Sequence, residues 1–97
     1  MTLHPQIAAF AAQLDDLCRL LRGQGDRLWS DRIDLIHRAV ADSNYNGVER
    51  FLALFEGEDS FADLTLADAD AQSALVTCRA AARAMAQRLA KEEQAGD

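Results

Sequence analysis

Apolar residues recur three and then four positions apart in three separate stretches of this 97-residue chain. That spacing places side chains on one face of an α-helix, whereas a strand requires alternation of every second residue. The apolar residues include nineteen Ala and thirteen Leu but only three Val and three Ile, which also favours helix over sheet. The three stripes are Ile7, Phe10, Leu14, Leu17 and Leu21; Trp29, Ile33, Ile36 and Val40; and Leu75, Cys78, Ala82, Met85 and Leu89.

The boundaries between the helices are marked by glycine and by short polar residues. Gly23 and Gly25 are expected to end the first helix, and Asp26 to cap the second. The run 42–44 should stop the second helix, and a shorter third helix is expected over roughly 45–55. Within the second helix, Leu28 and Leu35 are predicted to widen the buried face, and Asp34 is predicted to pair with Arg38 one turn later.

Residues 56–70 form the least helical stretch of the chain. Ser60 and Asp63 have the spacing of a capping box, which predicts a single turn that holds Phe61 and Leu64 inward. Either Asp68 or Asp70 should then cap the last helix. The sequence therefore predicts an all-α fold, a compact bundle of about four helices with one acidic loop before the last helix, as a single domain over 1–97 with a disordered tail at about 92–97.

The chain carries sixteen acidic and ten basic residues, a net charge of −6. This balance argues against nucleic acid and against an anionic membrane surface as partners, and it suits a basic protein partner. No stretch approaches the eighteen apolar residues of a membrane span, and the first ten residues lack the pattern of a signal peptide. Cys18 and Cys78 lie on helical stripes and are expected to be reduced thiols, so a cytoplasmic location is expected.

No pattern of residues points to catalysis, a metal or a cofactor. The only histidines, His4 and His37, have no metal-binding spacing, and the acidic stretch lacks the ligand order of a calcium loop. Ser60 has no histidine nearby in sequence, and the cysteines lie on core faces. We therefore expect a protein that is not an enzyme.

The acidic loop is the most distinctive part of the chain, with six carboxylates in fifteen residues and no base among them. One interpretation is a recognition surface, because charged loops with an inward aromatic residue often bind partners. The other is that these acids keep the loop solvated and cap the last helix. Both remain open from the sequence.

The stretch Phe55-Glu-Gly-Glu-Asp-Ser-Phe-Ala-Asp-Leu64 resembles the loop motif Phe-Gly-Gly-Met-Gly-Ser-Phe-Asn-Asp-Leu of a family of small bacterial all-helical proteins of unknown function. Three new acids, Glu56, Glu58 and Asp59, replace motif residues, and Ala62 replaces Asn. The resemblance implies a motif that is at least partly structural, with a changed partner or a lost site if the loop binds something. The matching residues are Phe55, Gly57, Ser60, Phe61, Asp63 and Leu64.

Small acidic helical proteins recur among bacterial immunity proteins, and this analogy of size and charge gives the leading hypothesis. The chain would be a non-enzymatic domain that neutralises a cognate basic toxin, and its contact residues would be Glu56, Glu58, Asp59, Phe61 and Asp63. The alternative is a self-associating structural or regulatory module, a homodimer built on an alanine face of the last helix. That face would comprise Ala80, Ala81, Ala84 and Ala86.

Overall fold

The computed structural model describes residues 5–42, 44–57 and 60–95, with side chains described as far as Glu92. Over these residues the chain forms four α-helices and one short 3-10 turn and contains no strand, which confirms the predicted all-α bundle. The elements are α1 (Pro5–Gly23), α2 (Arg27–Ala41), α3 (Asn46–Ala53), the 3-10 turn η1 (Phe61–Asp63) and α4 (Ala69–Ala95).

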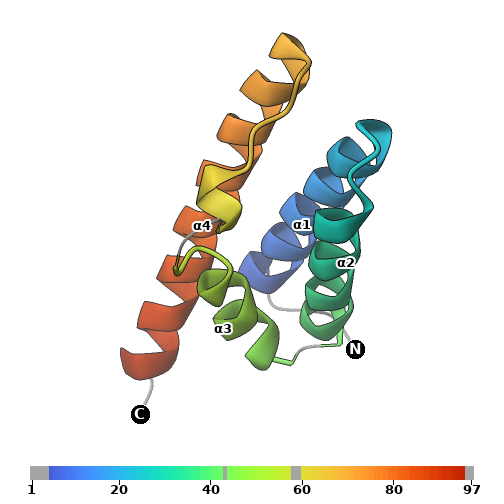
Figure 1. The fold of residues 1–97 in the computed structure, drawn as a ribbon. Coiled ribbons are helices and arrows are strands. Elements are labelled where there is room, and N and C mark those ends of the chain that lie inside the picture. Colours follow the sequence, from blue (N-terminus) through green and yellow to red (C-terminus); the bar gives the residue numbers. More distant parts are fainter. Residues whose placement is uncertain (1–4, 43, 58–59, 96–97) are drawn as a thin grey trace.

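Each helix packs against two others. Helices α1 and α2 form an antiparallel hairpin, and α4 runs antiparallel to α1 on the other side (Figure 1). The short helix α3 closes the bundle by contacting both α2 and α4. The segment that carries η1 runs back along α4 before that helix begins (Figure 1).

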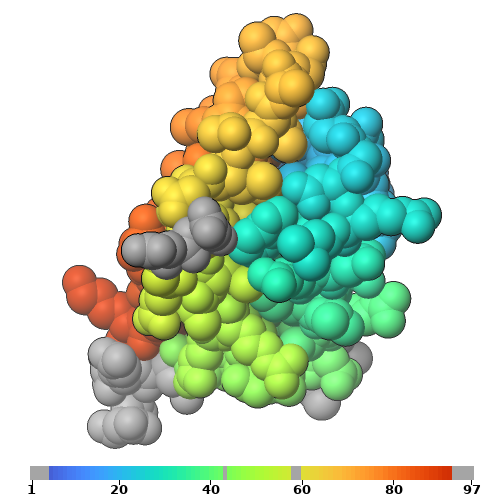
Figure 2. Space-filling view, in the orientation of Figure 1, coloured from blue at the N-terminus to red at the C-terminus, as the bar shows by residue number. Residues whose placement is uncertain are grey.

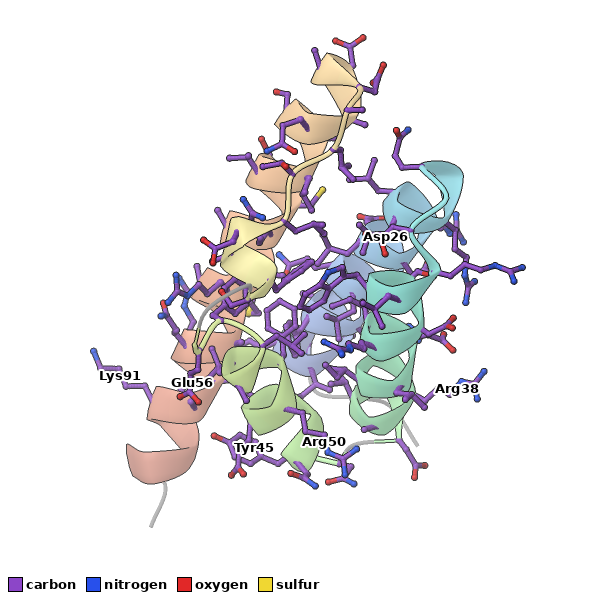
Figure 3. All side chains as sticks on the ribbon, viewed as in Figure 1. Asp26, Arg38, Tyr45, Arg50, Glu56 and Lys91 are labelled. Carbon is purple, nitrogen blue, oxygen red and sulfur yellow. The ribbon has the colours of Figure 1, made fainter. Side chains whose placement is uncertain are left out.

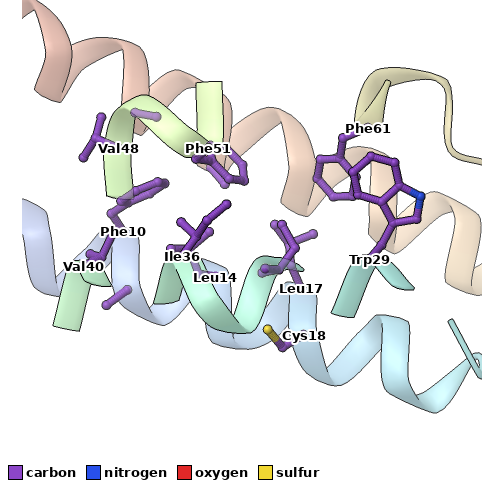
Figure 4. Close-up of a cluster of buried hydrophobic side chains, with 14 of the residues drawn as sticks. Phe10, Leu14, Leu17, Cys18, Trp29, Ile36, Val40, Val48, Phe51 and Phe61 are labelled. Atoms are coloured by element: carbon purple, nitrogen blue, oxygen red, sulfur yellow. The ribbon is translucent and has the colours of Figure 1, made fainter. Parts of the chain in front are cut away.

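The core follows the predicted stripes of α1 and α2. Phe10 packs edge-on against Phe51 at one end, with ring centroids 5.3 Å apart, and Trp29 stacks on Phe61 at the other end (Figure 4). Burying these large side chains supplies most of the driving force for folding. The fully buried large side chains are Phe10, Phe51, Phe61, Leu14, Leu17, Leu21, Ile33, Leu75, Val40 and Val48.

The turn between α1 and α2 forms as the sequence predicts. Gly25 has φ +79°, a left-handed conformation that glycine adopts without steric cost. The amide of Gly25 donates to the carbonyl of Arg22, and the amide of Asp26 donates to that of Leu21, the two bonds of a Schellman motif. The Asp26 carboxylate then accepts from the Trp29 amide at 3.0 Å and caps α2.

Helix α3 is shorter than the predicted 45–55, and its first turn contains Gly47. A Cβ atom at Gly47 would lie 2.8 Å from Cγ2 of Val40 and 3.2 Å from Cβ of Ala39. The glycine therefore allows the backbone of α3 to approach α2 closely. The close contact between the two helices explains why α3 contains a glycine, a residue that otherwise disfavours helix.

The prediction that Leu28 and Leu35 widen the buried face of α2 is wrong, because each is 60% exposed. Each precedes a core residue, Trp29 or Ile36, and one residue turns a helix by about 100°, which moves these leucines to the flank. The predicted pair of Asp34 with Arg38 is present at 3.1 Å.

Helix α4 continues to Ala95 and so includes residues 92–95 of the range expected as a tail. Residues 96–97 lie outside the described part of the chain.

Candidate partner-binding site

The acidic segment between α3 and α4 is held against the bundle by a buried aromatic side chain. Phe61 is 0% exposed, and its ring lies 5.1 Å from that of Trp29 and 5.6 Å from that of Phe55. The Phe61 amide donates to the carbonyl of Leu54 at 2.8 Å, which joins the turn η1 to the end of α3. The prediction that Phe61 and Leu64 point inward is confirmed, since Leu64 is also half-buried against the core.

Arg79 of α4 fixes the same segment from the other side. Its Nη1 donates to the carbonyls of Phe61 at 2.9 Å and Leu64 at 3.0 Å. Burial lowers the pKa of Arg79, while the nearby Asp63 acts in the opposite direction. The acidic segment has no base of its own, so the sequence reasoning missed this partner. One clue in the sequence points to Arg79 as this partner. It directly follows Cys78, a residue of the apolar stripe of the last helix, so its side chain begins close to the buried face.

Two further contacts join the segment to the start of α4. The Leu66 amide donates to Oε1 of Gln72 at 2.6 Å. The Asp68 carboxylate accepts from the Ala71 amide at 2.8 Å, so Asp68 caps the helix, and Asp70 is exposed one residue inside it. These contacts give the described residues 60–68 a defined path along α4.

The side-chain cap that the spacing of Ser60 and Asp63 predicts is absent. The single turn is present, and the Asp63 amide donates to the backbone carbonyl of Ser60 at 2.9 Å. The Ser60 side chain makes no capping hydrogen bond, although the residue is only 7% exposed.

A hollow of about 290 Å³ lies between the start of α2 and the turn η1. Among the described residues, Asp63 is the only charged one that lines this hollow, and its carboxylate forms none of the ion pairs found there. A second hollow of about 470 Å³ shares Thr65 and extends along the α1–α2 turn past Leu28. Figure 2 shows this face, where the yellow residues after Ser60 border the cyan residues at the start of α2. The first hollow is lined by Trp29, Ser60, Asp63, Leu64 and Thr65.

The predicted contact residues are distributed unevenly over this surface. Glu56 is exposed just after α3, and Figure 3 draws it apart from Asp26, the cap of α2. Asp63 is exposed at the hollow, whereas Phe61 is buried in the core and is not available to contact a partner in this conformation. Glu58 and Asp59 lie outside the described residues.

The described residues present no metal centre. They contain no group of three or more His, Cys, Asp or Glu side chains placed to hold a metal ion. Cys18 and Cys78 are free thiols, and burial, followed by the charge of Asp34, raises the pKa of Cys18 to about 11. A thiol with so high a pKa is a poor nucleophile at neutral pH. In the same part of the chain, no helix combines the length and the apolar character that a membrane crossing requires.

Comparison of the chain with protein-family models, with curated proteins and with solved structures finds no match.

Proposed function

We propose that this chain is a cytoplasmic, non-enzymatic protein-binding domain, specifically a bacterial immunity protein that neutralises a cognate basic toxin. The net charge of −6 suits a basic partner and would accelerate encounter with it. The observation that carries the proposal is the fixed path of residues 60–68, where Arg79, Gln72 and Phe61 hold an acidic turn in place.

A turn that is already ordered loses little conformational entropy when a partner binds, which favours affinity. An acidic segment that served only to keep the loop solvated would not need two carbonyls bound to one arginine. The exposed carboxylates Glu56 and Asp63 would make the contacts, together with Glu58 and Asp59. Phe61 would act indirectly, by holding the turn.

Co-expression tests the proposal. The protein encoded beside this chain would be expressed in a heterologous bacterium with and without it, and we expect the neighbour to stop growth only when it is expressed alone. Reversal of Glu58 and Asp59 to lysine should slow association of the purified pair, most strongly at low salt, because steering is screened by ions. An unchanged association rate would contradict a contact through the acidic loop. If the protein encoded beside this chain does not stop growth when expressed alone, the immunity role is contradicted.

A second candidate function, self-association through α4, is favoured by one observation. The outward side of that helix borders a hollow of about 320 Å³ and exposes Val76 at 47% together with Ala80, Ala81 and Ala84. Ala86, the fourth alanine of the predicted face, is fully buried in the core and cannot take part. Sedimentation equilibrium of the chain and of an Ala80→Glu variant tests this reading: a dimer lost on substitution supports it, and a monomer in both contradicts it.

A further inference from the structure

We propose that α4 pairs with α4 of a second copy of this chain, and that the two helices run antiparallel around a two-fold axis. This inference rests on the second candidate function, self-association through α4, and is independent of the immunity role. It goes beyond that candidate because it names the direction of the pairing and the charged residues that fix it.

The outward face of α4 is exposed over most of the length of the helix. On its inward side α4 packs against α1 and α3 and buries Ala71, Leu75, Ala82, Ala86 and Leu89. One residue turns a helix by about 100°, so a second set of residues falls within roughly 100° of arc on the opposite side. These residues are all exposed, and they are Asp70, Ser73, Thr77, Ala80, Ala81, Ala84, Arg88 and Lys91.

The charges of this face are divided between its two ends. Asp70 lies at the start of α4, whereas Arg88 and Lys91 lie near its end, and Glu92 lies to the side of the face. From Ala71 to Lys91 the helix carries four bases and no acid, although the net charge of the chain is −6. Asp70, Arg88 and Lys91 take part in none of the ion pairs found among the described residues. A face with one acidic and one basic end is complementary to a copy of itself that runs the other way.

A two-fold axis midway between Ala80 and Ala81 places every residue of this face opposite another residue of the same face. Asp70 of each copy then meets Lys91 of the other, and the Ser73 hydroxyl can accept from the Arg88 guanidinium. A parallel arrangement would bring Asp70 against Asp70 and Lys91 against Lys91, so the charges select the antiparallel one. The pairs are Asp70 with Lys91, Ser73 with Arg88, Thr77 with Ala84, and Ala80 with Ala81.

The middle of the face consists of small side chains. Thr77, Ala80, Ala81 and Ala84 allow the two helix axes to approach to about 8 Å, the lower end of the range for packed helices. The face from Asp70 to Lys91 is about 32 Å long, so the charged ends lie well outside this central contact. The small residues let the helices meet, and the end charges set their direction.

Sedimentation equilibrium of the unaltered chain, at low and at high salt, gives the first test. We expect a dimer in equilibrium with monomer, and a weaker dimer at high salt because ions screen the exposed end charges. A chain that stays monomeric at every concentration up to its solubility limit would overturn the inference.

Charge reversal at either end of the face tests the direction of the pairing. Asp70→Lys and Lys91→Asp each place like charges together at both ends of an antiparallel dimer, and each should weaken it by about five- to thirtyfold. The two variants change the net charge in opposite directions, so a general charge effect would weaken only one of them. Asp31→Lys makes the same change as the first variant at an exposed position of α2, outside the face, and should not weaken the dimer.

The exchange of both charges in one chain, Asp70→Lys together with Lys91→Asp, is the decisive measurement. Opposite charges meet again in an antiparallel dimer, so the affinity should return close to that of the unaltered chain. In a parallel dimer like charges would still meet, and no recovery would occur. An affinity as low as that of the single variants would therefore overturn the antiparallel arrangement. Far-UV circular dichroism checks that each variant keeps its helices.

The antiparallel pairing, self-association and the immunity role fail separately. A dimer that Ala80→Glu abolishes but that neither charge variant weakens contradicts only the antiparallel pairing. A monomeric unaltered chain contradicts self-association as a whole and leaves the immunity role, which co-expression tests, unaffected. Salt dependence is measured on the unaltered chain, so the inference stays testable even if a variant fails to fold.

Discussion

The connection between α1 and α2 and the connection between α3 and α4 are built by different means. The first spans three residues, Gln24 to Asp26, and is closed by backbone hydrogen bonds and one cap, all within five positions along the chain. The second spans residues 54–68, and its described part from Ser60 onward is held by Arg79, which lies 18 positions after Phe61 and 15 after Leu64. The first turn is thus determined locally, and the second depends on α4 being in place.

This difference bears on the proposed partner-binding role of the long connection. The carboxylate of Asp26 in the local turn caps α2, whereas the long connection exposes the carboxylate of Asp63, which forms no ion pair within the described residues. Because Arg79 of α4 holds the connection through backbone carbonyls, the side chain of Asp63 is not used to hold it in place. Four sets of substitutions, taken from the largest expected effect to the smallest, test the contrast.

Phe61→Ala should have the largest effect, because it removes a fully buried aromatic side chain that packs on Trp29 and Phe55. We expect a loss of about 3–5 kcal/mol in the free energy of unfolding, measured by urea titration. Leu28→Ala, at a side chain that is 60% exposed, is the matched control and should change stability by less than about 0.5 kcal/mol. Similar values for the two variants would mean that Phe61 does not hold the connection.

Arg79→Met should cost about 1.5–3 kcal/mol, the range for hydrogen bonds from a charged donor. It should also speed hydrogen exchange at the Phe61 amide, because the turn loses its tie to α4. Arg83→Met removes only a cation–π contact with Phe55 at 4.7 Å and should cost less than about 1 kcal/mol. If hydrogen exchange at the Phe61 amide does not change in Arg79→Met, the connection between α3 and α4 does not depend on α4. The two connections would then not differ in the way proposed here.

Two glycines give a matched pair of alanine substitutions. Gly47→Ala should cost about 1–3 kcal/mol through overpacking against Val40, and Val40→Ala should relieve part of this loss in the double variant. Gly25→Ala should cost about 1–2 kcal/mol through backbone strain at φ +79°, with nothing within 4 Å of the new Cβ. Val40→Ala should not rescue Gly25→Ala, and any rescue would contradict the local origin of that strain.

The helix caps should give the smallest effect. Asp26→Ala and Asp68→Ala each remove one side-chain acceptor from a helix start and should cost about 1 kcal/mol. Asp31→Ala, at an exposed position inside α2, serves as control. Fluorescence of Trp29 in Asp68→Ala should remain that of the unaltered chain, because Phe61 and Arg79 still hold the turn. A shifted emission would show that the cap also positions the segment.

Much of the fold is predictable from the sequence because its determinants are close together along the chain. The buried faces of α1 and α2, the Asp26 cap and the left-handed Gly25 all follow from spacings of four residues or fewer. The candidate site was predicted only in part. The single turn at residues 61–63 and the inward Phe61 were correct, but the same burial removes Phe61 from the contact surface.

The sequence by itself determined that this chain forms helices, where α1 ends and α2 begins, and that it carries an excess of negative charge around one irregular segment. Helical periodicity, caps and glycine conformations act within one or two turns, so they can be read from neighbouring residues. Only the tertiary structure decided that Leu28 and Leu35 stay exposed, that Gly47 is required against Val40, and that Arg79 holds the acidic turn. These outcomes depend on which helix faces meet and how closely, and side-chain packing between distant segments fixes that geometry.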